Sequence, residues 1–576
     1  MRWIFRDAEE AVVCKLAEEL QVPPLWARLL VLRGVSSAEQ SERFLEPRLA
    51  HLHDPFLMRG MAAAVQRLRQ ALRNGEKILI YGDYDVDGTM ASVVLLTALR
   101  KLGAHVEAYV PNRFTDGYGM RAAAIEQAAA QGFKLVVSVD TGIREHEALG
   151  RARELGIDCI VTDHHLPGPE LPPACALLNP HQRGCTYPEK NLTGAAVAFK
   201  LAQALLGERL SEQVLKSYLK IVTIGCIADV APLVGENRTI ARFGLDGLTE
   251  SAAKPSGVSA GRAGLSALLV GAGLSGKVVS SADVAFRLAP RLNAAGRMDD
   301  ARHVIDLFEA ASRADAQKVA GRLEALNRER RQTEELIRAG IEAQMKAQPE
   351  RLGRYSLVFS GEGWHRGVIG IAAQRAVELY HRPVLVIAVE DSCAHGSGRS
   401  IPGFHLFDAL STCQRLFSRF GGHDQAAGFS LPASRVNELE AAFERAARTV
   451  LTPSDLEPTL RVDAEVSVSD LTWALAAHLE KMEPFGYGNP APVFAANLEV
   501  AGSPRVLKEK HLRIRVKQGG ASLAATGWRL AGKAALLKTN QRFEAAFTFG
   551  VTEFQGEREL HLTLKDARPR AAGARF

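Results

Sequence analysis

The stretch KILIYGDYDVDGTMASVVLLTALRKLG, residues 77–103, decides the fold class of this chain. KILIYGDYD has the short apolar run of a buried β-strand, and TMASVVLLTALRKLG has the length and apolar spacing of an amphipathic helix. Three aspartates, Asp83, Asp85 and Asp87, stand where the strand gives way to the helix. The stretch therefore predicts one strand followed by one helix, with carboxylates at the end of the strand.

The same alternation repeats after residue 103. The segments typical of strands are HVEAYVPN (105–112), FKLVVSVD (133–140) and DCIVTDHH (158–165), and segments typical of helices, 121–132 and 144–156, separate them. Strands that alternate with helices in this way form a parallel sheet covered by helices. We therefore predict an α/β fold built on a parallel sheet.

The flanking segments predict several further parts. Residues 312–348 contain no proline and many strong helix formers, which predicts one long helix. Strand and helix patterns recur before Pro453, and period-two segments after it predict a small β-barrel, with an OB-fold as the first choice. The expected parts are a helical leader that packs on the main domain (1–73), the parallel-sheet domain (74–311), a connecting long helix (312–348), a second α/β domain (349–452) and the OB-fold domain (453–576).

Length and composition are those of an ordinary folded protein. At roughly 150 residues per domain, 576 residues correspond to about three to four domains. Hydrophobic residues make up 47% and charged residues 24%, which excludes disorder for most of the chain. The opening MRWIFRDAEEAVV carries acids where a signal peptide needs apolar residues, and no run of about eighteen apolar residues occurs. We expect a protein that is neither secreted nor membrane-spanning.

The cysteines indicate the cellular compartment, and the distribution of charge indicates the type of partner. None of the seven cysteines forms a C-x-x-C pair, which excludes a thiolate zinc site of the usual spacing and favours a reducing, cytoplasmic compartment. Residues 501–576 contain fifteen Lys and Arg against six acids, a net charge of +9, so residues 1–500 are net −3. A basic C-terminal domain indicates a polyanionic partner. Its aromatic residues are either stacking surfaces for bases or core residues: Trp528, Phe543, Phe547, Phe549 and Phe554.

Acidic and histidine residues recur at the ends of the predicted strands and once after a later apolar stretch. They are Asp83, Asp85, Asp87, Asp140, Asp163, His164, His165 and Asp229. In an extended chain the first three, being alternate residues, share one face. The carboxyl ends of parallel strands meet at one edge, where open α/β sheets build their sites. We therefore expect the whole set to form one cluster.

The donor types of this cluster indicate its chemistry. Two unit charges ~4 Å apart repel by about 4 kcal/mol at an intermediate dielectric, so close carboxylates need cations among them. Carboxylates with imidazole and no thiolate favour Mn²⁺ or Mg²⁺ over zinc, and the number of ligands favours two ions. Such a pair promotes hydrolysis of a phosphate ester or anhydride. No glycine-rich phosphate motif follows the first strand, which argues against an NTPase or a dinucleotide enzyme.

Several motifs carry a resemblance to a known family. DYDVDG (83–88), VDTG (139–142), TDHH (162–165) and ADVAPL (228–233) resemble the four motifs of the DHH phosphoesterase family, and GGHDQAAG (421–428) resembles the signature of its companion DHHA1 domain. Further segments are similar to the single-stranded-DNA exonucleases of that family, and the likeness covers nearly the whole chain. They are APRLNAAGRM (289–298), GWHRGVIGI (363–371), SGRS (397–400) and EPFGYGNPAPVF (483–494).

The resemblance implies a hydrolase that degrades single-stranded DNA from 5′ to 3′ into mononucleotides, in DNA recombination and repair, including mismatch repair. The implied ligands of two Mn²⁺ or Mg²⁺ ions are Asp83, Asp85, Asp87, Asp140, His164 and Asp229. By analogy Asp140 bridges the ions, Asp83 and Asp85 favour one of them, and the remaining ligands favour the other. His165 is expected to face the scissile phosphate, and Asp163 to orient a histidine.

A fixed direction of digestion requires recognition of one DNA end, and arginines near the motifs suggest how. The residues expected at the 5′-phosphate or the DNA backbone are Arg113, Arg291, Arg297, Ser397, Arg399 and His423. Ser397 and Arg399 are expected in a glycine-flanked turn whose amides form an anion site, and arginine binds phosphate in a bidentate manner. Arg291 and Arg297 are expected in a second turn. Ion pairing of these arginines across a cleft is the alternative.

Two other functions stay open at this point. Another phosphoesterase of the superfamily, such as an oligoribonuclease, a cyclic-dinucleotide hydrolase or a pyrophosphatase, leaves the basic C-terminal domain without a role. A non-catalytic single-strand-binding scaffold leaves the close carboxylates unexplained. Single-stranded DNA is the expected substrate, and a narrow cleft closed by the 312–348 helix is expected to exclude duplexes. The resemblance also implies a single-stranded-DNA-binding protein and a RecQ-type helicase as partners of a monomer.

Overall fold

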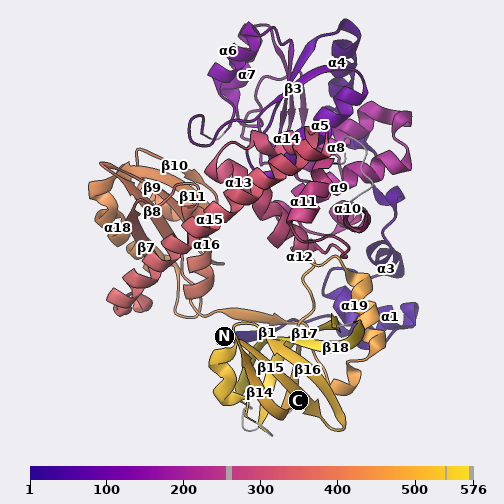
Figure 1. Cartoon of the computed structure of the whole chain (residues 1–576), viewed down its shortest axis with the longest axis vertical. Coiled ribbons are helices and arrows are strands. Elements are labelled where there is room, and N and C mark those ends of the chain that lie inside the picture. The colour runs from indigo at the N-terminus through magenta and orange to yellow at the C-terminus, as the bar shows by residue number, and fades with distance from the viewer. Residues whose placement is uncertain (118, 255–262, 539–540, 555, 570–576) are drawn as a thin grey trace.

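The strand and helix of residues 77–103 lie in the upper lobe of the computed structural model, which has three lobes (Figure 1). The structure describes the chain except residues 118, 255–262, 539–540, 555 and 570–576. The strands of this lobe form one sheet in the order β3-β2-β4-β5-β6, and every neighbouring pair is parallel. The strands are β2 (Lys77–Tyr81), β3 (His105–Tyr109), β4 (Leu135–Val139), β5 (Asp158–Thr162) and β6 (Ala176–Leu178). The predicted parallel sheet is confirmed.

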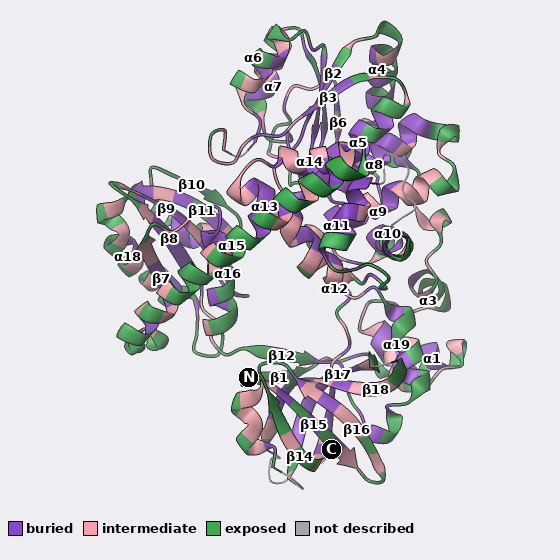
Figure 2. Ribbon diagram, viewed as in Figure 1, coloured by how far each residue is buried: buried purple, intermediate pink, exposed green. Residues whose placement is uncertain are grey.

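Helices cover both faces of this sheet, so the central strands β2, β4 and β5 are almost entirely buried (Figure 2), whereas the edge strand β3 exposes His105 and Glu107. Side chains alternate along β2: Ile78 and Ile80 join the core beneath one set of helices, and Leu79 and Tyr81 join the core beneath the other. The first set is α4 (Met61–Asn74), α5 (Val86–Lys101) and α8 (Gly194–Leu206), and the second is α6 (Ala122–Ala130) and α7 (His146–Glu154). This arrangement leaves the carboxyl ends of the strands free to carry polar side chains.

A group of helices extends the first core towards the other two lobes. It includes a π-helical turn, η4, which together with its neighbours makes a continuous helical segment from residue 281 to residue 298. The helices are α9 (Glu212–Ala228), α10 (Gly235–Ala253), α11 (Ala263–Gly271), α12 (Ser281–Asp283), η4 (Val284–Leu288), α13 (Ala289–Met298) and α14 (Arg302–Glu309).

The long helix expected from the sequence is α15 (Arg313–Ala347), which joins the upper lobe to the left lobe in Figure 1. Its last turns pack through Ile337 and Ile341 into the core of the left lobe. That lobe has a five-stranded sheet in the order β10-β11-β9-β8-β7, so the second α/β domain is confirmed. Its elements are β7 (Leu357–Glu362), α16 (Ile369–Tyr380), β8 (Val384–Glu390), β9 (Cys393–Arg399), α17 (Leu406–Ser411), β10 (Arg419–Gly422), β11 (Ala426–Pro432) and α18 (Val436–Val450).

The lower lobe contains the predicted barrel. Five strands close in the order β14-β15-β16-β18-β17, with β17 pairing back to β14, which is the closed five-stranded barrel expected of an OB-fold. Its elements are β12 (Thr459–Val462), β13 (Ala464–Glu465), α19 (Trp473–Met482), β14 (Phe494–Leu507), β15 (His511–Gln518), β16 (Ala521–Gly527), β17 (Arg542–Phe554) and β18 (Glu557–Pro569).

Residues 1–45 pack mainly on this barrel, and Phe44 also contacts Arg238 of the parallel-sheet domain, so the expectation that this part packs on the parallel-sheet domain is wrong for most of it. β1 (Arg2–Phe5) forms a parallel pair with β12. The helices α1 (Glu10–Leu20), α2 (Pro24–Val31) and α3 (Ala38–Leu45) share one apolar core with barrel residues such as Phe494. Only α4 packs beneath the parallel sheet. The amphipathic faces were evident in the sequence, but the surface that buries them was not.

The barrel core contains most of the aromatic residues that the sequence left open as stacking surfaces or core residues. Phe543, Phe547 and Phe549 are buried core residues, whereas Trp528 is 61% exposed. The side chain of Phe554 lies outside the described residues. Over the described part of the chain, no helix is long and apolar enough to cross a membrane.

Candidate active site

The first acidic segment turns from strand to helix, so its three aspartates are not the face of an extended chain. β2 ends at Tyr81, Asp85 caps α5 by accepting a hydrogen bond from Gly88 N, and Asp87 lies in the first helical turn. A Cβ atom at Gly88 would lie 2.7 Å from the Asp83 backbone oxygen, so the tight turn requires glycine there. The turn still directs all three carboxylates to the sheet edge.

Asp87 and Asp140 approach each other over the N-terminus of α8. Asp87 accepts hydrogen bonds from the backbone N–H groups of Gly194 (2.5 Å) and Ala195 (3.1 Å), which favours a negative charge at that helix end. Asp140 follows β4 with a φ of 61°. A Cβ atom at Gly194 would lie 2.5 Å from the Asp140 carboxylate, and one at Gly225 would lie 2.6 Å from Asp87 Oδ1. The two glycines therefore make room for the carboxylates.

The two histidines after β5 are in opposite electrostatic states. Burial lowers the pKa of His164 to about 4, helped by the charge of its neighbour, so this imidazole is neutral and free to bind a metal. Burial also opposes the charge on His165, but a 2.7 Å hydrogen bond between its Nδ1 and Asp163 Oδ1 outweighs it and raises the pKa to about 9. Asp163 is buried, and its hydrogen bonds hold its own pKa below the usual value. His165 is therefore a fixed cation.

The carboxylates and His164 form one compact group, named here the acidic cluster: Asp83, Asp85, Asp87, Asp140, His164 and Asp229. Asp229 ends α9, and its carboxylate lies 3.8 Å from His164 Nε2. Three sets of ligand atoms, each within 4.8 Å of one another, are Asp83–Asp85–Asp140, Asp87–His164–Asp229 and Asp140–His164–His165. Asp140 belongs to the first set and lies 3.1 Å from His164 of the second, so it adjoins both.

The charges of the acidic cluster are unbalanced in the protein alone. Burial, followed by neighbouring carboxylates, raises the pKa of Asp83 and of Asp87 to about 7 and that of Asp229 to about 8. The same causes place the pKa of Asp140 well above its usual value. Asp140 Oδ1 is buried, lies 3.1 Å from His164 Nε2 and still accepts no well-aligned hydrogen bond from the residues that the structure describes. An oxygen-rich set of this kind fits hard divalent cations such as Mn²⁺ and Mg²⁺.

Three arginines lie together beside the acidic cluster, and we name them the arginine cluster: Arg113, Arg297 and Arg399. Burial and the charge of Arg113 lower the pKa of Arg297 to about 9 and that of Arg399 below its usual value. Arg113 stacks 4.3 Å from the ring centre of Tyr84, and its buried Nε forms no hydrogen bond with any described residue. Within the described residues, none of the three forms an ion pair. The alternative that acids across the cleft neutralise them is therefore not what the structure has.

Two expectations about these residues are wrong. Ser397 and Arg399 lie on the strand β9 and not in a turn, so the backbone of that segment pairs with β8 and β11 and forms no anion site. Arg291 and Arg297 lie on the helix α13 and not in a turn, and they point to different surroundings. Arg291 forms a 2.7 Å ion pair with Glu324 of α15, so the structure does not bring it to the arginine cluster.

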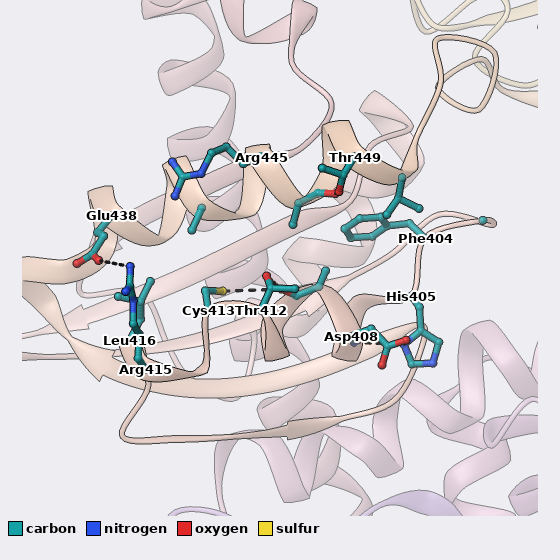
Figure 3. A pocket seen from close by; sticks show the side chains of 15 residues that line it. Phe404, His405, Asp408, Thr412, Cys413, Arg415, Leu416, Glu438, Arg445 and Thr449 are labelled. Carbon is teal, nitrogen blue, oxygen red and sulfur yellow. Dashed lines mark hydrogen bonds and ion pairs between the residues drawn. The ribbon is translucent and has the colours of Figure 1, made fainter.

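His423 lies at a larger cavity of about 940 Å³ between the upper and left lobes. It is exposed, and its Nδ1 is 3.2 Å from Asp424 Oδ1. His165 and Arg419 line the same cavity, so the expected position of His423 near the substrate is consistent with the geometry. A separate cavity of about 590 Å³ lies between α17 and α18 and is lined by Phe404 and Arg445, with no residue of either cluster (Figure 3).

Sequence reasoning missed the residues that support the cluster. Gly194 and Gly225 lie in segments whose only sequence signal is helical, and their closeness to the carboxylates depends on how α8 and α9 pack. Asn179 donates a hydrogen bond to the backbone oxygen of His165, and Tyr84 supports Arg113. Tyr84 could have been noticed, since it stands between two predicted ligands.

Three segments match protein families. Residues 77–226 match the DHH family, N-terminal domain, residues 353–449 match the DHHA1 domain, and residues 462–566 match the RecJ OB domain. The matches cover the parallel-sheet domain, the left lobe and the barrel.

Curated proteins and solved structures agree with these matches. The chain is 37% identical over 574 residues to the single-stranded-DNA-specific exonuclease RecJ of Bacillus subtilis, covering 98% of this chain and 71% of that protein. It is 34% identical over 573 residues to the Escherichia coli protein of the same name, covering 95% and 96%. The crystal structure of RecJ from Thermus thermophilus in complex with Mn²⁺ has a TM-score of 0.83 at 30% identity, over 99% of this chain and 80% of that one. The corresponding complex with Mg²⁺ has a TM-score of 0.78 at 28% identity.

Proposed function

The chain belongs to the RecJ family of exonucleases and is a hydrolase, and from this premise we propose that it removes mononucleotides from the 5′ end of single-stranded DNA. The observation that carries the proposal is the acidic cluster beside the arginine cluster. The carboxylates of the acidic cluster lack neighbouring cations, and the guanidinium groups of the arginine cluster lack neighbouring anions. A metal-bound DNA end supplies both.

The acidic cluster is suited to hold two Mn²⁺ or Mg²⁺ ions. Asp83 and Asp85 would hold one ion, Asp87, His164 and Asp229 would hold the other, and Asp140 adjoins both sets of ligand atoms. When bound, the ions activate the phosphodiester and the attacking water and screen the carboxylates from one another. The N-terminus of α8 fixes Asp87, so this ligand is in place before an ion binds.

His165 stabilises charge on the reacting phosphate or on the leaving oxygen. Asp163 holds its Nδ1, so the opposite side of the ring is directed away from Asp163. Asp163 itself is fixed by the backbone N–H groups of Ile143, His164 and His165. A cation held this rigidly stabilises a developing negative charge without reorganising.

The arginine cluster and Ser397 bind the 5′-phosphate, which sets the direction of digestion. Arg399 donates a hydrogen bond to Ser397 Oγ, so the two side chains face the same space. Buried guanidinium groups without acidic partners bind a phosphate dianion strongly, because the anion removes their mutual repulsion. His423 contacts the DNA backbone at the 940 Å³ cavity, which His165 also lines.

Further properties follow from family membership. We expect a monomer that works in the cytoplasm, where its seven free cysteines stay reduced. The barrel binds single-stranded DNA upstream of the cleft, and the cleft beside α15 excludes duplexes. The biological setting is DNA recombination and repair, including mismatch repair, with a single-stranded-DNA-binding protein and a RecQ-type helicase as partners.

The test uses one single-stranded oligonucleotide, labelled separately at each end, with the purified protein and Mn²⁺. Immediate release of a labelled mononucleotide from the 5′ end is expected, with gradual shortening when the 3′ end carries the label. A blunt duplex should remain intact, and EDTA should stop the reaction. Release from the 3′ end first would overturn the proposed direction.

The same assay separates the two alternatives. Hydrolysis of pyrophosphate or of short oligoribonucleotides, with single-stranded DNA left intact, would favour another phosphoesterase. Binding of the oligonucleotide without cleavage would favour the scaffold. Asp140→Ala serves as the control, because it should abolish hydrolysis while sparing DNA binding.

A further inference from the structure

A groove of about 480 Å³ lies next to the acidic cluster, and the proposed function assigns no role to it. The parallel-sheet domain contributes Val230, which follows Asp229, together with Phe286 and Arg297. The barrel lobe contributes Phe485 and Tyr487 from the segment that follows α19, and this segment reaches up to α12 in Figure 1. The groove therefore joins residues of the proposed active site to residues of the DNA-binding lobe.

The lining of the groove is both apolar and positive. Phe286 is 76% exposed and Tyr487 is 66% exposed, and Val230 is also exposed. Among the described residues that line it, Arg297 and Arg330 are the charged ones and none is acidic. A ligand that fits these walls has flat apolar faces and negative charge, as a chain of nucleotides has. An acidic protein segment lacks the flat faces.

Two backbone contacts press the barrel-lobe segment against the catalytic domain. Leu233 N donates a 2.7 Å hydrogen bond to Tyr487 O. A Cβ atom at Gly488 would lie 2.8 Å from Pro232 Cβ, so the approach is as close as glycine permits. Tyr487 is thus placed by its backbone while its ring stays exposed.

A buried arginine fixes the base of this segment. Arg238 of α10 donates to the backbone oxygens of Glu483 (2.8 Å) and Phe44 (2.6 Å), and it stacks on the Phe44 ring. Asn489 donates 2.9 Å hydrogen bonds to the backbone oxygens of Met482 and Pro484. Because these bonds satisfy buried polar groups on both sides, the segment is held in one conformation. This accounts for the sequence EPFGYGNPAP, which the catalytic residues leave unexplained.

Phe286 lines the same groove from the parallel-sheet domain. It lies in the π-helical turn η4, a rare conformation that is frequent at functional sites. Arg297 follows eleven residues later on the same continuous helical segment, about 16 Å along its axis. A strand whose 5′-phosphate contacts Arg297 therefore reaches Phe286 a few nucleotides from its end.

We propose that this groove binds unstacked nucleobases of the single strand a few nucleotides inward from its 5′ end, with Phe286 and Tyr487 as the stacking surfaces. The inference rests on the proposed function and adds a base-binding site to it. Aromatic stacking does not depend on which base is present, so the site gives affinity without sequence preference.

The experiment measures binding of a 5′-phosphorylated, 3′-fluorescent oligonucleotide in EDTA, where hydrolysis stops. Phe286→Ala and Tyr487→Ala should each weaken binding by about 5- to 100-fold, while Phe286→Trp and Tyr487→Phe should retain it. Phe56→Ala is the matched control, since Phe56 is 52% exposed on η2 (Pro55–Leu57) away from the groove. An unchanged melting temperature shows that each variant is folded.

A second set of strands carries one abasic site at each of the first several nucleotides in turn. An abasic site at the stacked position should weaken binding by the wild-type protein by a similar factor, and should weaken binding by the alanine variants no further. The proposal would be overturned if the alanine substitutions weakened binding of intact and abasic strands equally. It would also be overturned if both alanine variants bound the intact strand with wild-type affinity. If the wild-type protein did not digest single-stranded DNA at all, the proposed function would fail instead, so the two failures are distinguishable.

Discussion

The acidic cluster and the arginine cluster lie side by side but are built differently. Every member of the acidic cluster comes from the parallel-sheet domain, at strand ends or helix ends of one continuous core. The arginine cluster takes Arg113 from the loop after β3, Arg297 from α13 and Arg399 from β9 of the other lobe. The first site forms when one domain folds, whereas the second needs two lobes held in place by α15. The comparison indicates that metal binding and recognition of the DNA end can be disturbed separately.

The largest expected effect belongs to the acidic cluster. Asp140→Asn should lower the rate of hydrolysis about 1000-fold or more, because it removes a ligand next to both metal sets. In EDTA the same variant should melt at a higher temperature than the wild-type protein, since a buried carboxylate with a strongly raised pKa has been neutralised.

Initial rates in Mn²⁺ and thermal unfolding in EDTA check both parts of this prediction. A variant that is inactive and also less stable without metal would show that Asp140 supports the fold and that repulsion in the acidic cluster is small.

Substitutions in the arginine cluster should impair recognition of the 5′-phosphate, whereas substitutions of nearby arginines outside it should not. Arg297→Ala should lower kcat/KM for 5′-phosphorylated strands by about 10- to 100-fold, the contribution of one or two charged hydrogen bonds. The loss should be much smaller for strands with a 5′-hydroxyl. Arg291→Ala, on the same helix but paired with Glu324, should keep the preference for a 5′-phosphate. If both substitutions reduced the preference for a 5′-phosphate equally, the assignment of Arg297 but not Arg291 to end recognition would be wrong.

A substitution of Asp163 tests whether cleavage also depends on a residue that is not itself an expected metal ligand. Asp163→Asn keeps the shape of the side chain but removes the charge that holds His165. We expect cleavage to slow by about 10-fold, as for other residues that orient a group at a metal site. The affinity for a 5′-phosphorylated strand, measured in EDTA, should stay unchanged. A loss of affinity would mean that His165 belongs to end recognition.

The smallest effect is expected in the barrel, remote from both clusters. Trp528→Ala should weaken binding of a long strand by about 5-fold and leave a short 5′-phosphorylated strand unaffected, because one exposed ring stacks on one base. Fluorescence anisotropy with strands of increasing length measures this. A loss on the shortest strand would show instead that the barrel contributes to the cleft itself.

Much of the candidate active site could be predicted from the sequence. Asp83, Asp140 and Asp163 each follow a predicted strand, and carboxyl ends of parallel strands must meet at one edge, so their convergence required no knowledge of packing. The barrel and the long helix were predictable for the same reason, because period-two and helix-forming patterns are local.

Tertiary structure decided what depends on contacts between distant segments. Arg291 and Arg297 are six residues apart on one helix, but Arg291 pairs with Glu324 whereas Arg297 lies among other arginines. Ser397 and Arg399 resembled a turn among glycines, yet neighbouring strands draw them into β9. The N-terminal helices bury their apolar faces on the barrel, and Tyr487 reaches the catalytic domain from the barrel lobe. Periodicity specifies which face of an element is buried, but only the packed chain specifies which surface covers it.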